Sequence, residues 1–276
     1  MTLDDLRKSF DFFDQKPFAK GGQKEVYAAR HPEYGDVVVK ILNNVDERAN
    51  REIELLSKFG FHDVPRIYAV HDIELYGNPT IAVIEERIEG EVVRSIINSG
   101  RRYSLYEAAD FVENMLNIIN EVWSRRVVHR DIKPENIIRR SDGHYILLDF
   151  GIARMLDRTS ITSSEQNGPL TPGYAAPEII QEGKSAIDTR SDLFSIGVVT
   201  YELVKGYNPF TKNANNIFQM LYNTTTITPV FHTLPGDVQH QFMGLVSSMM
   251  SRDQFARPAN AEEALRFLAN ARTTFA

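Results

Sequence analysis

Short apolar runs alternate with turn residues along the first third of the chain. The runs are rich in β-branched residues and cover residues 25–29, 36–42, 66–70 and 80–84. Runs of this length, bounded by turn residues, are typical of β-strands. A helical pattern over residues 46–59 interrupts them, and an apolar pattern over residues 3–13 predicts a short opening helix packed on the strands.

After Gly90 the pattern becomes mostly helical. Ser104 and Glu107 have the spacing of a capping box, and they open a long apolar stripe at helical spacing that ends at Val122. Further helical patterns cover approximately residues 190–205, 213–222, 235–250 and 260–270, the last opened by Asn260. The second part of the chain is therefore expected to be larger and mostly α-helical.

Together the two patterns predict an α+β, bilobal fold. We expect a small β-rich N-terminal lobe with one main helix over residues 1–86, a linking segment over 87–90, and a larger α-helical C-terminal lobe over 91–276. A length of 276 residues with 42% hydrophobic and 25% charged residues suits a soluble globular chain of this kind.

Charge and cysteine content exclude several classes of function. Lys plus Arg total 31 against 37 Asp plus Glu, a net charge of −6 with no long basic block, so nucleic acid is not an expected partner. The absence of cysteine excludes disulfides and thiolate chemistry. No apolar run approaches the roughly 18 residues that span a bilayer, and the opening MTLDDLRKSF does not resemble a signal peptide. No membrane association is expected, and we predict a cytoplasmic location.

The strongest motif is His129-Arg-Asp-Ile-Lys-Pro-Glu-Asn136. It is followed by Asp149-Phe-Gly151 at the end of the apolar run 145–148, which predicts a buried strand that carries an acid at its tip. In these motifs the chain resembles the eukaryotic-type (Hanks-type) protein kinase family, and Lys133 places the resemblance in the serine/threonine branch. The resemblance implies a protein kinase fold, with residues 15–270 covered.

The resemblance assigns each part of phosphoryl transfer to a residue. Asp131 is the candidate acceptor of the substrate hydroxyl proton, and Lys133 neutralises charge on the transferred group. Asn136 and Asp149 supply the oxygen ligands that Mg²⁺ prefers. The implied cofactors are ATP and Mg²⁺, with Mn²⁺ as a substitute.

A second lysine and a glutamate are expected in the small lobe. Lys40 in Val37-Val-Val-Lys40 matches the family's strand lysine that holds the α and β phosphates and pairs with a helix glutamate. Glu52 lies in the middle of the apolar stripe of the 46–59 pattern, where a carboxylate is costly unless paired. We therefore predict a Glu52–Lys40 bridge, with both residues in catalysis.

The glycine-rich loop departs from the family pattern. The family's three-glycine motif falls on the segment that includes Ala19, Lys20, Gly21, Gly22 and Val26, with only Gly21 in register. These residues are the candidate phosphate-binding loop, because glycines let backbone N–H groups approach phosphates. The alternative is that the two glycines form only a hairpin turn.

The linking segment resembles the family's hinge. Glu86 and Arg87 are expected to present backbone groups to adenine, and Glu85 to guard the pocket behind it. An acid at that position is unusual, and we expect a nearby base or amide to satisfy it.

A hydroxyl-rich stretch after Gly151 resembles an activation segment that ends in Thr171-Pro-Gly-Tyr-Ala-Ala-Pro-Glu178. Arg130 resembles the arginine that grips a phosphorylated loop residue. The candidate phosphosites are Thr159, Ser160, Thr162, Ser163, Ser164 and Thr171.

Three further residues are expected to hold the large lobe together. Asp192, in Asp192-Leu-Phe-Ser-Ile-Gly197, resembles the aspartate that opens a buried helix and ties down the catalytic loop backbone. Arg257 resembles the arginine that bridges to the glutamate of the Ala-Pro-Glu motif, here Glu178.

The resemblance predicts a serine/threonine protein kinase that transfers the γ-phosphate of ATP to Ser/Thr hydroxyls of protein substrates and autophosphorylates in its activation loop. A transient homodimer is expected for autophosphorylation in trans. The alternative is a catalytically weak pseudokinase that acts as a nucleotide-responsive scaffold, which only the degenerate glycine-rich loop favours. A small-molecule phosphotransferase is disfavoured by the platform for peptide that the 171–178 segment and Asp192 imply.

Overall fold

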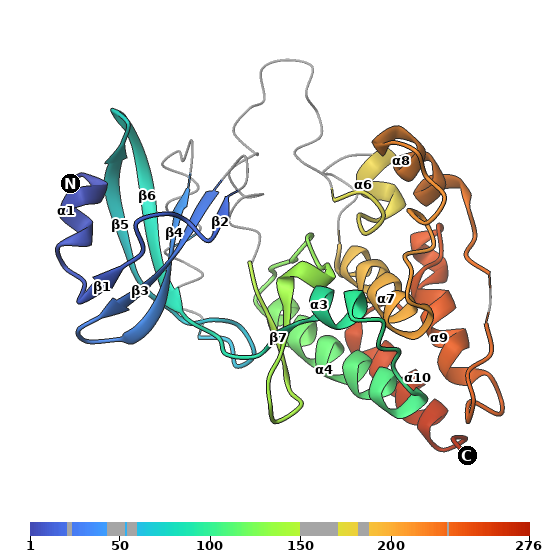
Figure 1. Cartoon of the computed structure of the whole chain (residues 1–276). Helices are drawn as coiled ribbons and strands as arrows, with labels where there is room; N and C mark the ends of the chain where they lie inside the picture. The colour runs from blue at the N-terminus through green and yellow to red at the C-terminus, as the bar shows by residue number, and fades with distance from the viewer. Residues whose placement is uncertain (21–23, 43–52, 54–59, 150–170, 182–187, 231) are drawn as a thin grey trace. The chain divides into compact units, whose positions relative to one another are not determined.

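The computed structural model describes residues 1–20, 24–42, 53, 60–149, 171–181, 188–230 and 232–276. The described residues divide into two units, one that ends at Glu89 and one that begins at Gly90. Figure 1 shows an antiparallel sheet with a short helix in the first unit, and a helical body with a small sheet in the second. The predicted α+β class, with strands before helices, is confirmed.

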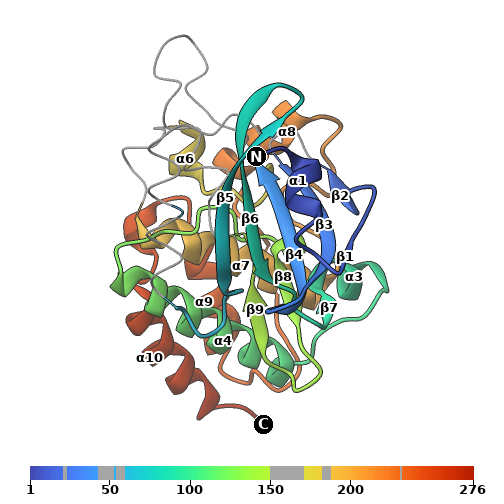
Figure 2. The same cartoon turned by 90° about the vertical axis from the view of Figure 1, so that its left-hand side faces the viewer.

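The first unit is a six-stranded antiparallel sheet. Its path runs β1-β3-β4-β6-β5, with β2 paired to β3 (Figure 2). Its elements are α1 (Leu3–Arg7), β1 (Phe12–Phe13), β2 (Ala19–Lys20), β3 (Lys24–His31), β4 (Gly35–Leu42), β5 (Ile67–Leu75) and β6 (Asn78–Glu86).

The β5–β6 hairpin extends beyond the predicted runs. Leu75 pairs with Asn78, so only Tyr76 and Gly77 form the turn, and both have positive φ angles of 53° and 81°. A two-residue turn of this kind matches the twist of the flanking strands. Pairing therefore continues through polar residues that the apolar pattern does not mark.

The core of the first unit lies between the sheet and the opening helix. Leu6 of α1 is 2% exposed and belongs to a buried cluster with Phe13, Tyr27 and the apolar residues of β4 and β6. A Thr2 capping box begins the helix. The predicted opening helix on the strands is confirmed. Of the predicted 46–59 helix only Ile53 is described, and it is fully buried.

The second unit is mostly helical. Its small sheet has the order β7-β8-β9. Its elements are β7 (Glu91–Val92), α3 (Val93–Asn98), α4 (Leu105–Ser124), η1 (Pro134–Asn136), β8 (Ile137–Arg139), β9 (Tyr145–Leu147), α6 (Pro177–Gln181), α7 (Thr189–Lys205), α8 (Ile217–Thr226), α9 (Gln241–Met249), η4 (Gln254–Ala256) and α10 (Ala261–Arg272).

Helix α7 is the centre of the second unit. It is buried along almost its whole length, it packs against α4 and α9, and α10 packs on both of those helices. A helix that is buried on all sides needs neighbours on all sides. None of the described helices is long and apolar enough to cross a membrane.

Two helices begin later than the apolar pattern predicts. The Asn216 side chain accepts a hydrogen bond from the Gln219 N–H, which starts α8 at Ile217 rather than near residue 213. Before α9, the Asp237 carboxylate accepts from the Phe242 and Met243 N–H groups at 3.1 and 2.9 Å. Residues 235–240 form a turn there, with His240 at a φ of 57°. Apolar spacing did not distinguish that turn from a helix.

The long helix α4 begins as predicted. The Ser104 N–H donates to the Glu107 carboxylate at 2.9 Å, and the Glu107 N–H donates to the Ser104 hydroxyl at 3.3 Å. Asn260 caps α10 by accepting from the Glu263 N–H at 2.9 Å. Both predicted starts are confirmed.

We expect Ser104→Ala to lower the free energy of unfolding by about 1 kcal/mol, because the first turn of α4 then loses its side-chain acceptor. Urea denaturation of the full chain measures the loss. Ser104→Thr keeps a hydroxyl and should remain within about 0.5 kcal/mol of wild type; equal stability of the Ala and Thr variants would contradict the assigned cap.

Candidate active site

The loop that carries the His129–Asn136 motif is tied to α7 by one carboxylate. Asp192, in the first turn of α7, accepts hydrogen bonds from the backbone N–H groups of His129 at 2.9 Å and Arg130 at 2.8 Å. His129 and Asp192 are 0% and 2% exposed. Burial raises the pKa of the Asp192 carboxyl and lowers the pKa of His129. The structure thus places Asp192 where the sequence predicts it, under the loop backbone.

The His129 ring links the loop to the strand that precedes Asp149. Its Nδ1 accepts from the Asp131 N–H at 3.2 Å, and its Nε2 lies 2.9 Å from the Leu148 carbonyl oxygen. Because Nδ1 accepts, the neutral ring carries its proton on Nε2 and donates to Leu148. The ring therefore fixes the start of the loop against the end of β9.

Three side chains of the second unit meet around the Asp131 carboxylate. Lys133 Nζ donates to Asp131 Oδ2 at 2.9 Å, and the Asn136 amide donates to the same oxygen at 3.2 Å and to the Asp131 carbonyl at 2.9 Å. The Thr171 hydroxyl donates to Asp131 Oδ1 at 2.7 Å and accepts from Lys133 Nζ at 3.2 Å. Asp131 and Lys133 keep 20% and 22% of their side chains exposed, so the group is accessible to a ligand.

Thr171 has a place here that its hydroxyl alone did not indicate. The sequence puts it among the candidate phosphosites, whereas the structure puts its hydroxyl between Asp131 and Lys133. The hydroxyl fixes which way the Asp131 carboxylate faces. Phosphorylation of Thr171 stays an untested prediction.

The metal candidates Asn136 and Asp149 lie on adjoining segments. The Leu148 N–H donates to the Asn136 carbonyl at 2.8 Å, and Asp149 follows directly with a φ of 57°. The Asn136 amide nitrogen is committed to Asp131, which leaves its side-chain oxygen as the ligand atom. One amide oxygen and one carboxylate fit Mg²⁺, which takes few protein ligands and completes its shell with phosphate and water. Two of the described non-glycine residues with positive φ, Arg130 (68°) and Asp149, lie at this site, where such strained backbone is often found.

In the first unit, Lys40 pairs with Glu85. Lys40 Nζ lies 2.5 Å from Glu85 Oε2, and the side chains are only 9% and 6% exposed. The prediction that a nearby base or amide satisfies Glu85 is confirmed, and the partner is Lys40. The predicted Glu52 partner lies outside the described residues.

The hinge and loop candidates are described in part. The Glu86 N–H donates to the Arg66 carbonyl at 2.8 Å, and its carboxylate accepts from the Arg66 N–H at 3.2 Å, so this N–H is not the group that meets a ligand. Arg87 follows directly after β6.

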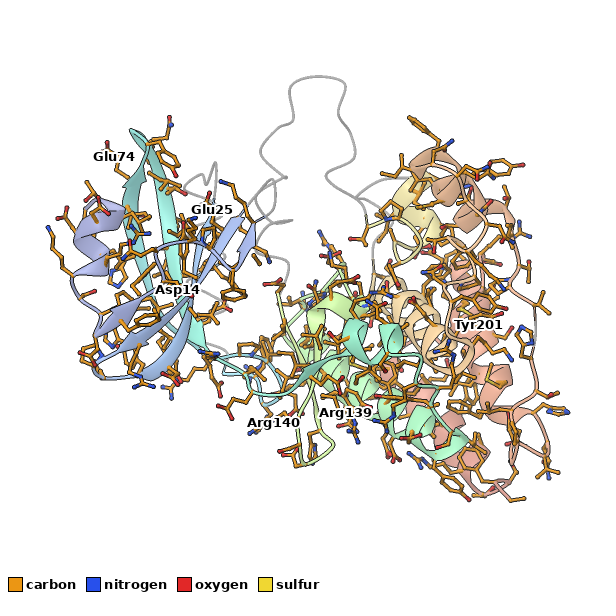
Figure 3. The ribbon with its side chains drawn as sticks, viewed as in Figure 1. Asp14, Glu25, Glu74, Arg139, Arg140 and Tyr201 are labelled. Atoms are coloured by element: carbon orange, nitrogen blue, oxygen red, sulfur yellow. The ribbon has the colours of Figure 1, made fainter. Side chains whose placement is uncertain are left out.

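At the predicted phosphate loop, Ala19 and Lys20 pair with Val26 and Glu25. Glu25, labelled on β3 in Figure 3, lies 2.6 Å from Lys20 Nζ. The hydrogen bond from Lys20 lowers the pKa of the Glu25 carboxyl. The antiparallel β2–β3 pairing places Lys20, a residue of the predicted loop, next to Glu25. The candidates that lie outside the described residues are Gly21, Gly22, Thr159, Ser160, Thr162, Ser163 and Ser164.

The predicted platform pair is present. Arg257 donates from Nη1 and Nη2 to the two carboxylate oxygens of Glu178 at 2.7 and 2.8 Å, and both side chains are at least 95% buried. The Ser191 hydroxyl donates to Glu178 at 2.9 Å. The pair joins α6 to the segment before α10.

A second, partly buried cluster was not found from the sequence. Arg94 of α3 donates to Glu135 at 2.7 Å, to Glu202 of α7 at 2.8 Å, and to the Tyr174 hydroxyl at 2.5 Å. The Tyr174 hydroxyl also donates to Glu202, and burial raises the pKa of Tyr174. The Arg94 guanidinium thus joins four parts of the second unit: α3, the loop that carries the His129–Asn136 motif, α7 and the segment after Thr171. The available signal was Glu202, a carboxylate in the mostly apolar second half of α7.

Comparisons with known proteins agree with this geometry. A family model described as "Protein kinase domain" matches residues 14–267. The chain is 31% identical over 243 residues to "Calcium/calmodulin-dependent protein kinase cmkA" of Emericella nidulans, which covers 84% of this chain and 56% of that protein. It is 30% identical over 272 residues to "Serine/threonine-protein kinase pkn2" of Myxococcus xanthus, covering 93% and 32%. A "Probable serine/threonine-protein kinase PknB" of Bifidobacterium longum is 29% identical, covering 88% and 37%. The chain thus spans about half the length of these relatives or less.

We expect Arg257→Met to lower the free energy of unfolding by about 3–5 kcal/mol, because it leaves the buried Glu178 carboxylate without its partner. Chemical denaturation of the full chain measures this. Arg272→Met is the matched control, because Arg272 pairs with the exposed Asp110 and Glu113 and should cost less than about 1 kcal/mol. Equal losses in the two variants would contradict the role given to burial.

Proposed function

The chain belongs to the protein kinase family, and from that premise we propose that it is a serine/threonine protein kinase that transfers the γ-phosphate of ATP to Ser/Thr hydroxyls of proteins. One observation carries the proposal: Lys133, Asn136 and Thr171 all hydrogen-bond the Asp131 carboxylate. The family's chemistry needs a carboxylate that accepts the substrate hydroxyl proton, and this arrangement orients one.

Each residue of the cluster has a task in this reaction. Asp131 holds the substrate hydroxyl in line and accepts its proton as the oxygen–phosphorus bond forms, while the bond from the γ-phosphorus to the bridging oxygen breaks and ADP leaves. Lys133 keeps the carboxylate in place and presents positive charge to the transferred group. Asn136 and Asp149 would hold Mg²⁺, which supplies charge neutralisation on the phosphates when bound. Lys40 is proposed to contact the α and β phosphates. At the metal site, Mn²⁺ is proposed to be able to replace Mg²⁺.

The anchored segment that begins at Thr171 favours a protein substrate. Thr171 begins the segment that continues through Tyr174 to Glu178, and Arg257 and Arg94 anchor that segment. A fixed segment next to the proton acceptor is a surface on which an extended peptide can be aligned. We therefore propose that protein substrates are recognised there.

The direct test is transfer of labelled γ-phosphate from ATP with Mg²⁺ to the chain itself and to a generic protein substrate. Label on serine and threonine is expected for wild type. Asp131→Asn should reduce the rate at least about a hundredfold, since general-base catalysis is lost. Asp142→Asn, which changes an exposed aspartate on the β8–β9 turn in the same way, should keep the wild-type rate. Nucleotide binding without transfer in wild type would contradict the proposal and favour a nucleotide-responsive scaffold.

Thr171→Val removes the hydroxyl that fixes Asp131 but keeps the side-chain shape. We expect the rate of transfer to fall about tenfold, as for a lost hydrogen bond of roughly 1.4 kcal/mol to a charged group, while the ATP affinity stays unchanged. Thr171→Ser restores the hydroxyl and should restore most of the rate. Steady-state kinetics on the three proteins measures this. A Val variant as fast as wild type would contradict the role of the Thr171 hydroxyl in orienting Asp131.

Regulation and location are part of the proposal as well. We propose a cytoplasmic location, and we propose autophosphorylation within residues 159–164 through a transient homodimer. The support for autophosphorylation is the density of hydroxyls in that segment and the presence of Arg130 beside Asp131. Mapping of phosphosites on active protein tests it, and active protein without phosphate in that segment would contradict it.

A further inference from the structure

The Lys40–Glu85 pair differs from the other ion pairs described in the first unit. Its two side chains are 9% and 6% exposed, whereas Arg30 and Asp36 of another pair are 62% and 48% exposed, and Lys20 of a third is 67% exposed. A buried ion pair is held by strong attraction, because little water screens it. The Lys40 charge is thus already compensated by a carboxylate inside the protein.

The strand register shows in which direction Lys40 extends. Lys40 of β4 lies opposite Val83 of β6, and Glu85 lies opposite Val38. The ion pair is therefore diagonal, and it draws the ammonium toward the end of β6 at Glu86. The β2–β3 hairpin, which carries the predicted phosphate loop, adjoins the other end of β4, where Lys24 pairs with Leu42. In this conformation the ammonium is held away from that end of the sheet.

This inference rests on the proposed function, in which Lys40 contacts nucleotide phosphates. One ammonium cannot fully neutralise both a buried carboxylate and a phosphate. We propose that Glu85 competes with the nucleotide phosphates for Lys40, and that this competition sets the affinity of the protein for phosphate-bearing nucleotides. Glu85 is in this account a positioning residue, since it acts on the nucleotide through Lys40.

The account makes the effect of Glu85 depend on the phosphates of the ligand. Removal of the Glu85 carboxylate charge removes the group that draws the Lys40 ammonium toward Glu86, so ATP and ADP should bind more tightly. Adenosine has no phosphate and should not respond. A merely structural role for Glu85 would change the binding of all three ligands together.

The experiment measures dissociation constants for ATP, ADP and adenosine by calorimetry on the full chain, in the presence of Mg²⁺. Glu85→Gln should lower the constants for ATP and ADP roughly five- to tenfold, the range of a single partly buried charge, and leave adenosine unchanged. Glu74→Gln is the matched control. It makes the same chemical change at an exposed residue of β5, near the β5–β6 turn (Figure 3), and should change none of the constants.

Glu85→Met removes the same charge with an unbranched apolar side chain and should give the same selectivity for phosphate-bearing ligands. Equal or weaker ATP binding by both Glu85 variants overturns the inference, as does an equal change for ATP and adenosine. These results leave the proposed function standing if wild type still binds ATP and transfers phosphate. Wild type that binds adenosine and ATP equally also overturns the inference, because Lys40 then contributes no attraction for phosphate, whereas only a wild type without phosphate transfer overturns the proposed function.

Discussion

The hydrogen bonds from two backbone N–H groups to the buried Asp192 carboxylate are the constraint on which the site depends. They fix His129 and Arg130 on the first turn of α7, the most buried helix of its unit. A carboxylate in such a place has lost its water, and the two N–H groups replace it. Because the backbone is held on both sides of the His129–Arg130 peptide, Arg130 keeps its positive φ and Asp131 leaves the loop in one direction.

Each of the two units also contains charges that are buried in pairs. Glu178 with Arg257, Glu202 with Arg94, and Lys40 with Glu85 each place a carboxylate in an apolar setting together with one cation. Such pairs contribute little net stability compared with apolar residues of the same volume, but the loss of one partner strongly destabilises the fold. Each pair therefore selects one arrangement of the segments that it joins, and in the second unit those are the segments around Asp131 and Thr171.

The sequence was most informative where chemistry and local pattern coincide. The motif around Asp131 could be predicted, and the role of Asp192 and the Glu178–Arg257 pair followed from its resemblance to the protein kinase family, in which residues of these types stand at fixed places in the sequence. The direction of a side chain could not be predicted. Thr171 is one hydroxyl among many in the sequence, and only the structure shows that it faces Asp131. The partner of Glu85 was predicted as a base or an amide, but its identity depends on the register of β4 and β6, which are not consecutive strands. Arg94 was missed because a lone arginine after the hinge looks like a solvated residue.

Native-state hydrogen exchange at the His129 and Arg130 amides tests the central claim most directly. If Asp192 holds the loop, both amides exchange with a protection close to that of the α7 core, roughly a thousandfold or more above an unprotected loop. Asp192→Asn should lower that protection while the amides in the middle of α7 stay protected. Exchange in wild type as fast as that of the exposed β5–β6 turn would contradict the account, because the loop would then be held by something other than this carboxylate.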